Sequence, residues 1–268
     1  MAKLNLTAAL RAEYKRMFDT VTINAGKQAA VEGLVASLVA NKDRYKAVGD
    51  PLGMPWHVVA VIHNMESSQN FTRHLHNGDP LTKRTTHVPA GRPATGTPPF
   101  TWEESAADAL TLHGFPDWHD WTVAGTLYQL ECYNGTGYRL YHPSVKTPYL
   151  WSFSNWYTQG KYIQDGTWSA TAKSDQCGAA VLLRRMAEKQ WIGFTDEPLP
   201  DPDRPPLMVN YAASKPSDPA VLAAAETLQA WLNTHAGIFV KVDGWPGKGT
   251  SDALKAVTGH HLPGDPRG

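Results

Sequence analysis

Apolar residues recur along the first part of the chain at the spacing of amphipathic helices. Over residues 26–48 they fall at intervals of three and four, on one helical face: Val31, Leu34, Val35, Leu38 and Val39. A second helix is predicted to begin at Pro55, because proline suits the first helical turn. In this helix Val59, Ile62 and Glu66 share one stripe. The sequence therefore places a carboxylate on an apolar face near the end of a helix.

Between residues 71 and 99 the pattern becomes polar and rich in turn-forming residues. Residues 77–79 (Asn-Gly-Asp) are a turn signal, and residues 85–88 have the pattern of a short strand. We therefore expect a small β-lobe or a lid loop directly after the helix that carries Glu66.

Three further helices are predicted before the composition changes. One has capping-box spacing at its start and spans residues 101–112, one runs over about residues 118–134, and one begins at Ser174. The intervening stretch 138–171 is aromatic and weakly periodic, so no element is assigned to it. This part of the chain is expected to form one mainly α (α+β) domain.

The composition changes abruptly after this domain. Residues 196–206 are rich in Pro and Asp and cannot form a helix or a central strand, which predicts a semi-rigid linker over residues 195–217. Asp218 and Thr250 are then suited to cap two short helices. We divide the chain into a domain of residues 1–194, a linker and a small helical domain of residues 218–268.

Charge and composition restrict the partners. Lys plus Arg and Asp plus Glu number 25 each, so no net field attracts the chain to nucleic acid or to a membrane surface. Ten Trp and ten Tyr offer flat apolar faces that suit the C–H faces of sugar rings. Cys132 and Cys177 have no metal-binding spacing, and a single bridge between them stays open. We recognise no signal peptide and no membrane-spanning stretch, so we expect synthesis in the cytoplasm without membrane insertion.

The end of the chain resembles the small helical peptidoglycan-binding domain. Residues 228–233 (LQAWLN) and 242–254 (VDGWPGKGTSDAL) carry the pattern of that family: a Leu-Gln helix, a Val-Asp-Gly turn, a Gly before Thr, and a final helix. The inserted Pro246 with its Gly-Lys-Gly run departs from the pattern. The resemblance implies that this domain binds the cell wall, and the alternative is a docking appendage without a ligand.

The front domain resembles the lysozyme and lytic transglycosylase superfamily. The likeness rests on Glu66-Ser67 at a helix end, the polar segment after it, and residues 133–135 (Tyr-Asn-Gly) at a later helix end. It departs from many transglycosylases because no Gly-Leu-Met-Gln-like turn follows Glu66. The resemblance implies a lysozyme-like helical fold in which Glu66 is the general acid and the Tyr-Asn helix end lines a sugar groove. With the wall-binding tail, it implies a phage-type endolysin that acts on host peptidoglycan after release from the cytoplasm.

Breaking a glycosidic bond requires a proton for the leaving oxygen and stabilisation of an oxocarbenium-like centre. Desolvation raises the pKa of a carboxyl group and keeps it protonated near neutral pH. Glu66 is therefore the predicted proton donor. Asp79 is the candidate second catalytic carboxylate. Its alternative role is that of a turn residue, in which case Thr82, Thr85 or Thr86 would hold a water.

The predicted substrate contacts come from the segments next to these two acids and from the later helix end. They are Ser67, Thr86, His87, Glu131, Tyr133, Asn134 and Tyr138. Glu131 lies on the apolar face of its predicted helix, so it points inward and needs a partner. Arg139, Arg84 and Arg92 are candidates, and a structural ion pair is favoured over a catalytic role.

Three alternatives to a muramidase remain open at this point. A lytic transglycosylase would act on the same bond. A zinc-dependent stem-peptide hydrolase would use His74 and His76 with His63 or His87 as ligands, although no His-Glu-x-x-His pair exists. A non-catalytic glycan-binding or virion protein would use Glu66 only to bind sugar. For the favoured muramidase we expect no cofactor, no metal site, peptidoglycan as the partner and a monomeric state.

Overall fold

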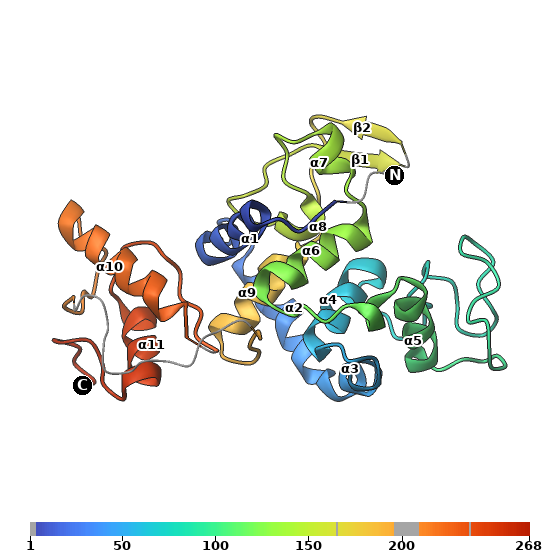
Figure 1. Ribbon diagram of the computed structural model, residues 1–268, viewed down its shortest axis with the longest axis horizontal. Helices are drawn as coiled ribbons and strands as arrows, with labels where there is room; N and C mark the ends of the chain where they lie inside the picture. The colour runs from blue at the N-terminus through green and yellow to red at the C-terminus, as the bar shows by residue number, and fades with distance from the viewer. Residues whose placement is uncertain (1–3, 165, 196–208, 236) are drawn as a thin grey trace. The chain divides into compact units, whose positions relative to one another are not determined.

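Figure 1 shows the computed structural model, which describes residues 4–164, 166–195, 209–235 and 237–268. Within these residues the chain is mainly helical, and its one sheet has two strands. The mainly helical fold class is therefore confirmed. Residues 196–208, which make up much of the predicted linker, lie outside the described residues.

The helices and strands can be followed in Figure 1. In chain order they are α1 (Ala8–Thr20), α2 (Gln28–Ala40), α3 (Lys42–Gly49), α4 (Trp56–Ser67), α5 (Trp102–Leu112), α6 (Val123–Asn134), α7 (Gly137–Tyr141), α8 (Pro148–Trp151), β1 (Lys161–Gln164), β2 (Thr167–Ser169), α9 (Ala179–Glu188), α10 (Pro219–Leu232) and α11 (Lys248–Thr258). Short 3₁₀ turns at residues 50–52 and 115–117 complete the described elements.

By its contacts the chain forms two compact units. The first unit contains residues 1–6, 23–121 and 125–183, and the second contains residues 7–22, 122–124 and 184–268. The division falls inside α9, and α1 groups with the C-terminal part of the chain. Whether the predicted domains 1–194 and 218–268 fold independently stays a prediction.

Helix α4 is the centre of the first unit. Helix α3 packs against α4 and α5, and α2 packs against α4. The run from Val58 to Ile62 has no exposed surface, so α4 is buried on all sides over this stretch. Its end is different, because Glu66 is exposed after the buried Met65. The predicted stripe thus emerges from the core at the acid.

Several sequence-based boundaries are wrong. The helix predicted over residues 26–48 is interrupted at Asn41, where α2 ends and α3 begins. Helix α6 begins at Val123 rather than near residue 118, and α9 begins at Ala179 rather than at Ser174. The capping box of α5 is confirmed, with Thr101 and Glu104 bonded to each other's backbone N–H groups.

The segment 71–99 is a loop and not a β-lobe. The strand predicted over residues 85–88 is absent, because local side-chain contacts take its backbone groups. The Thr86 and His87 amides both donate to the Asp79 carboxylate, and the Thr85 amide donates to the Arg92 carbonyl. The sheet instead joins β1 to β2 in the aromatic stretch that had no assignment.

The second unit has a small core between α10 and α11. Leu228, Leu232 and Leu254 are fully buried there. Gln229 lies beside this core and holds the turn between the helices, because its Oε1 accepts hydrogen bonds from the backbone N–H groups of residues 243 and 244. Helix α1 joins the unit through Phe18, whose ring meets those of residues 194 and 239 edge to face.

Helix α10 begins as expected and α11 does not. Asp218 caps α10 with Pro219 at the first position. Helix α11 starts at Lys248, so the prediction that Thr250 caps it is wrong. The Thr250 hydroxyl instead accepts from Gln229 Nε2 and donates to the Trp245 carbonyl.

Gly178 tests how α8 is positioned in the first unit. A Cβ atom there would collide with the backbone carbonyl group of Leu150. The variant Gly178→Ala must therefore displace α8 or the start of α9, and we expect a loss of about 1–3 kcal/mol or more in the free energy of unfolding measured in urea. Gly33→Ala is the control, since its added Cβ meets nothing within 4 Å. Equal stability of Gly178→Ala and the wild type would contradict this packing.

Candidate functional site

The end of α4 has an unusual backbone. Ser68 and Gln69 both adopt positive φ, at 52° and 62°, although neither is glycine. The Ser68 amide bonds the Asn64 carbonyl at 3.1 Å, and the Gln69 side chain donates to Asn64 Oδ1 at 2.9 Å. Left-handed residues close many helices, but two successive non-glycine ones are strained. The contacts around Asn64 hold the chain in this shape directly after Glu66.

Gln176 anchors the same helix end from a distant part of the sequence. Its Nε2 donates to the Met65 carbonyl at 2.7 Å and to the Asn64 carbonyl at 3.1 Å. Carbonyls in the last turn of a helix have no partner within the helix, so they accept such bonds readily. Gln176 therefore fixes the backbone on which Glu66 is carried.

Glu66 lies at this anchored end and is bonded to Tyr149. The Tyr149 hydroxyl donates to Glu66 Oε1 at 3.1 Å. Part of the Glu66 side chain is open to solvent, while protein atoms crowd the carboxyl group. This desolvation raises the pKa of Glu66, and the hydrogen bond from Tyr149 opposes the rise because it stabilises the carboxylate. Glu66 thus has the open access and the raised pKa that a proton donor needs.

Two tyrosines form the surroundings of this carboxyl group. Burial raises the pKa of Tyr133 and of Tyr149 above the ordinary value, and the negative charge of Glu66 adds to both shifts. Both phenols therefore stay protonated at neutral pH. The ring of Tyr133 packs against His113 and Phe115, with centroids 4.7 and 5.5 Å apart.

A groove lies next to Glu66, with a volume of about 540 Å³. Its described lining comprises Met65, Asn134, Tyr138, Pro148, Tyr149, Lys161, Tyr162, Gln164, Gly166, Ser174 and Gln176. Glu66 is not itself among these residues. Its neighbour Met65, its partner Tyr149 and the anchor Gln176 are, so the groove opens beside the acid.

The structure brings part of the predicted site together. Asn134 and Tyr138 line the groove, and Tyr133 lies close enough to Glu66 for its pKa to respond to that charge. The Ser67 hydroxyl donates to the His63 carbonyl at 3.4 Å, within its own helix. Tyr133, Asn134 and Tyr138 thus lie near Glu66 or in the groove beside it, as expected for the predicted substrate contacts.

Asp79, Thr86 and His87 form a separate cluster in the loop 71–99. Both Asp79 oxygens are engaged, since Oδ2 accepts from the Thr86 and His87 amides and Oδ1 meets His87 Nδ1 at 2.6 Å. The two backbone hydrogen bonds hold the pKa of Asp79 well below its usual range. These bonds stay within the loop, whereas Glu66 is bonded to Tyr149. The geometry therefore favours the structural role of Asp79.

Glu131 is buried in an ion pair. Its Oε1 lies 2.8 Å from Arg139 Nε, and its side chain is 3% exposed. The predicted inward orientation agrees with this geometry, and of the three candidate partners the structure pairs Glu131 with Arg139. A buried acid held in this way supports α6 and α7 rather than reaching a ligand.

The histidines of the zinc alternative are held by other groups. His74 is buried, with Nδ1 2.8 Å from the Ser105 hydroxyl and Nε2 2.8 Å from the Lys83 carbonyl. The others pair as follows: His63 with Tyr45, His76 with Asp108, and His87 with Asp79. Burial also lowers the pKa of His63 to about 4. Over the residues described, no three His, Cys, Asp or Glu side chains are grouped as metal ligands would be.

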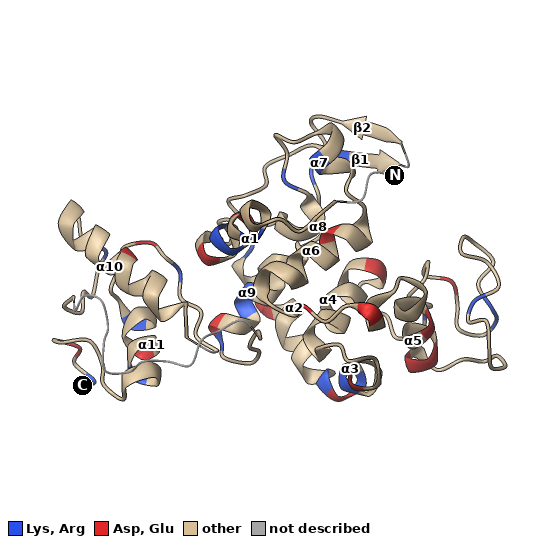
Figure 2. Cartoon of the chain, viewed as in Figure 1, with Lys and Arg blue, Asp and Glu red and all other residues tan. Residues whose placement is uncertain are grey.

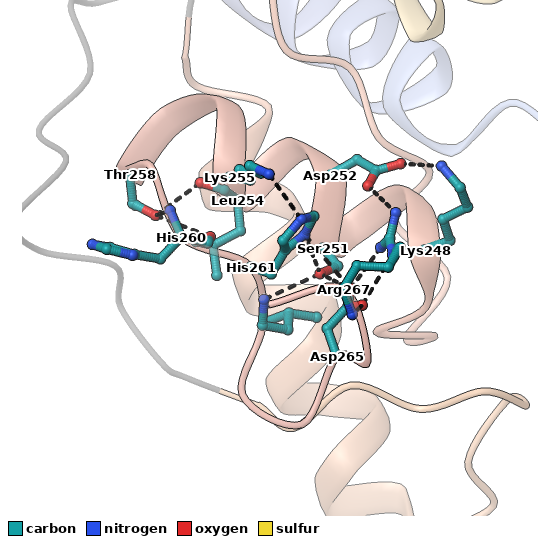
Figure 3. Close-up of polar contacts among 11 residues, drawn as sticks. Lys248, Ser251, Asp252, Leu254, Lys255, Thr258, His260, His261, Asp265 and Arg267 are labelled. Atoms are coloured by element: carbon teal, nitrogen blue, oxygen red, sulfur yellow. Dashed lines mark hydrogen bonds and ion pairs between the residues drawn. The ribbon is translucent and has the colours of Figure 1, made fainter.

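Figure 3 shows a Ser-His-Asp group in the second unit, made by Ser251, His261 and Asp265. The single hydroxyl proton of Ser251 is donated to Asp265, and its oxygen accepts from the Leu262 amide. His261 therefore has no proton to remove from it. Arg267 also binds both Asp265 oxygens, at 2.9 and 2.6 Å. The group attaches the chain end to α11 and is not a nucleophilic site.

Charges of both signs are interspersed in each unit (Figure 2). Among the helices that the structure describes, none combines the length and apolar character required to cross a membrane. Cys132 and Cys177 are not joined by a disulfide, so the bridge left open by the sequence is not formed.

Comparison with protein-family models found no matching family, and comparisons with curated proteins and with solved structures found no match either. The resemblances drawn from short motifs therefore stay predictions, and the functional argument depends on the geometry around Glu66.

Sequence reasoning missed three residues of this region: Tyr149, Lys161 and Gln176. Tyr149 and Lys161 come from the weakly periodic stretch 138–171, and Gln176 lies where a helix was wrongly predicted to begin at Ser174. The density of tyrosines in that stretch was the one available signal of a binding surface.

The variant Tyr149→Phe tests the proton balance of the site. Without the phenol hydroxyl the carboxylate of Glu66 loses a donor, so the pKa of Glu66 should rise further above the wild-type value. The measurement is a ¹³C NMR titration of the Glu66 carboxyl signal, assigned by its loss in Glu66→Gln. Tyr141→Phe, on an exposed tyrosine of the same unit, should leave the titration unchanged. A lower or unaltered pKa in Tyr149→Phe would refute the hydrogen bond.

Proposed function

We propose that this protein is a peptidoglycan hydrolase of the muramidase type, which cleaves the β-1,4 bond between amino sugars. The observation that carries the proposal is Glu66: a carboxyl group with a raised pKa, accessible to solvent, and adjacent to a groove lined by aromatic and amide side chains. Glycoside cleavage needs a protonated acid at such a position.

In this mechanism Glu66 donates its proton to the glycosidic oxygen as the bond to the anomeric carbon breaks. The Tyr149 hydroxyl already donates to Oε1, so it stabilises the carboxylate that the transfer leaves. Tyr133 and Tyr149 stay neutral and so add no negative charge that would repel the carboxylate formed by the transfer.

The poor fit of Asp79 to the role of second catalytic group favours one further candidate function. Asp79 is saturated by hydrogen bonds in its own loop and is poorly suited to activate water. A single acid suffices when a hydroxyl or acetamido group of the sugar itself attacks the anomeric centre. A lytic transglycosylase acting on the same bond is therefore the second candidate.

The second unit is proposed to bind the wall. A cavity of about 630 Å³ lies in it, lined in part by Tyr211, Gln229, Lys241 and Trp245. Attachment of the wall to one unit raises the local concentration of glycan at the other. This role agrees with the proposed partner, peptidoglycan, and with action on the wall after release from the cytoplasm.

The decisive experiment compares wild type with Glu66→Gln on purified peptidoglycan. We expect the variant to bind walls and to lose about 10²–10⁴-fold in cleavage rate, the usual contribution of a general acid. Glu226→Gln, on the exposed side of α10, is the matched control and should retain full activity. Undiminished cleavage by Glu66→Gln would eliminate the acid role.

Mass spectra of the products then separate the candidates. New reducing ends identify a hydrolase, and anhydro-sugar ends identify a transglycosylase. New amino groups would indicate peptide cleavage, and binding without any product would indicate a glycan-binding protein.

Trp245 tests the wall-binding role of the second unit. Its side chain is 40% exposed and lines the cavity, so Trp245→Ala should weaken cosedimentation with insoluble walls about tenfold. Trp191, 39% exposed in the same unit but outside this cavity, supplies the control Trp191→Ala. Cleavage of short soluble fragments should be the same in both variants. If the two variants sediment equally, the cavity is not the wall site.

A further inference from the structure

We propose that the groove beside Glu66 binds a carboxylate of the sugar chain at Lys161, and that this contact selects an acidic amino-sugar polymer over a neutral one such as chitin. The inference rests on the proposed function and names the substrate feature that the groove recognises. It follows from three properties of the groove: its charge, its aromatic wall and the amide group of Asn134.

Lys161 is the one charged residue in the described lining of the groove. It is half-buried on β1, and its ammonium group has no ion-pair or hydrogen-bond partner among the described residues. No described carboxylate lines the groove to neutralise it. A cation beside low-dielectric walls attracts an anion more strongly than one on an open surface does. The groove is therefore suited to bind a ligand group that carries one negative charge.

An aromatic cluster follows Lys161 in the hairpin and supplies a wall of the groove. Tyr162 follows Lys161 on β1, and its ring meets Tyr138 at 5.4 Å and Trp168 at 5.2 Å. The Tyr162 amide also donates to the Tyr138 hydroxyl at 3.3 Å. Trp168 stacks on His142 at 3.5 Å. Tyr138 and Tyr162 line the groove, where such rings suit the C–H faces of sugars.

Neutral polar groups complete the lining. Asn134 is exposed, and no described group bonds its side-chain amide, so the amide is available to an acetamido substituent. Gln164 and Ser174 add further amide and hydroxyl groups. Rings, amides and one cation together match an N-acetylated sugar chain with a carboxylate on its repeat. In peptidoglycan the lactyl group or the stem peptide carries that carboxylate, and chitin has no equivalent.

The test measures binding in the Glu66→Gln background, so that cleavage does not interfere. The probes are a soluble peptidoglycan tetrasaccharide with free carboxylates and the same compound after amidation of its carboxylates with methylamine. We expect Lys161→Gln to raise the Kd of the charged probe about 3–30-fold at low salt and to leave the Kd of the amidated probe nearly unchanged. Lys161→Arg should restore most of the affinity, because it keeps the charge.

Lys173→Gln is the matched control. Lys173 is exposed in the same unit and lies outside the described lining, so the variant should bind both probes as the parent does. Thermal unfolding of each variant establishes that the fold is kept. The preference for the charged probe should also decrease as ionic strength rises.

Two results would overturn the proposal. If Lys161→Gln weakens both probes equally, Lys161 only shapes the hairpin; if it changes neither, the groove does not recognise the carboxylate. These outcomes differ from failure of the proposed function, which would appear as undiminished cleavage by Glu66→Gln in an otherwise wild-type chain.

Discussion

The hydrogen bonds from Gln176 to the last carbonyls of α4 are the interaction on which the rest of the site depends. They join a helix end with two left-handed residues to a segment 111 positions later in the chain. The same segment leads to Gly178, which packs against Leu150 without space for a side chain. Because Tyr149 precedes Leu150 on α8, one anchor fixes both the acid and its hydrogen-bond partner. The site is therefore as rigid as the contacts around residues 174–178.

The pKa values of two carboxyl groups in the first unit are shifted in opposite directions, and their surroundings explain why. Glu66 is crowded by protein atoms and receives one hydroxyl donor, so its neutral form is favoured. Asp79 receives two backbone amides and an imidazole, so its charged form is favoured. In enzymes that use two carboxyl groups, such a difference separates the proton donor from the group that stays ionised. Here the ionised Asp79 is bonded within the loop 71–99, and Glu66 is the proposed proton donor.

The sequence predicted the helices whose ends carry their own signals and failed where tertiary contacts decide. Pro55, the Thr101 capping box and Asp218 all mark real helix starts. The loop 71–99 was mistaken for a β-lobe because strand propensity gives no account of side chains that bond the backbone. In the site, Glu66, Asn134 and Tyr138 could be found because they sit at or near helix ends. Tyr149 and Gln176 could not, since their contacts span 83 and 111 residues.

A single well-supported acid has a consequence for the chemistry. In the proposed mechanism the Tyr149 hydroxyl remains bonded to the carboxylate after Glu66 gives up its proton, so Glu66 can later accept a proton from an attacking hydroxyl. Those two steps need no second carboxylate if the attacking group belongs to the sugar or is a water held at the anomeric carbon. The hydrogen bond from Tyr149 thus limits how far the pKa of Glu66 rises. A limited rise would let Glu66 act first as a proton donor and then as a proton acceptor. A stronger donor would ionise it too early, and without a donor the carboxylate left by the first transfer would be poorly stabilised.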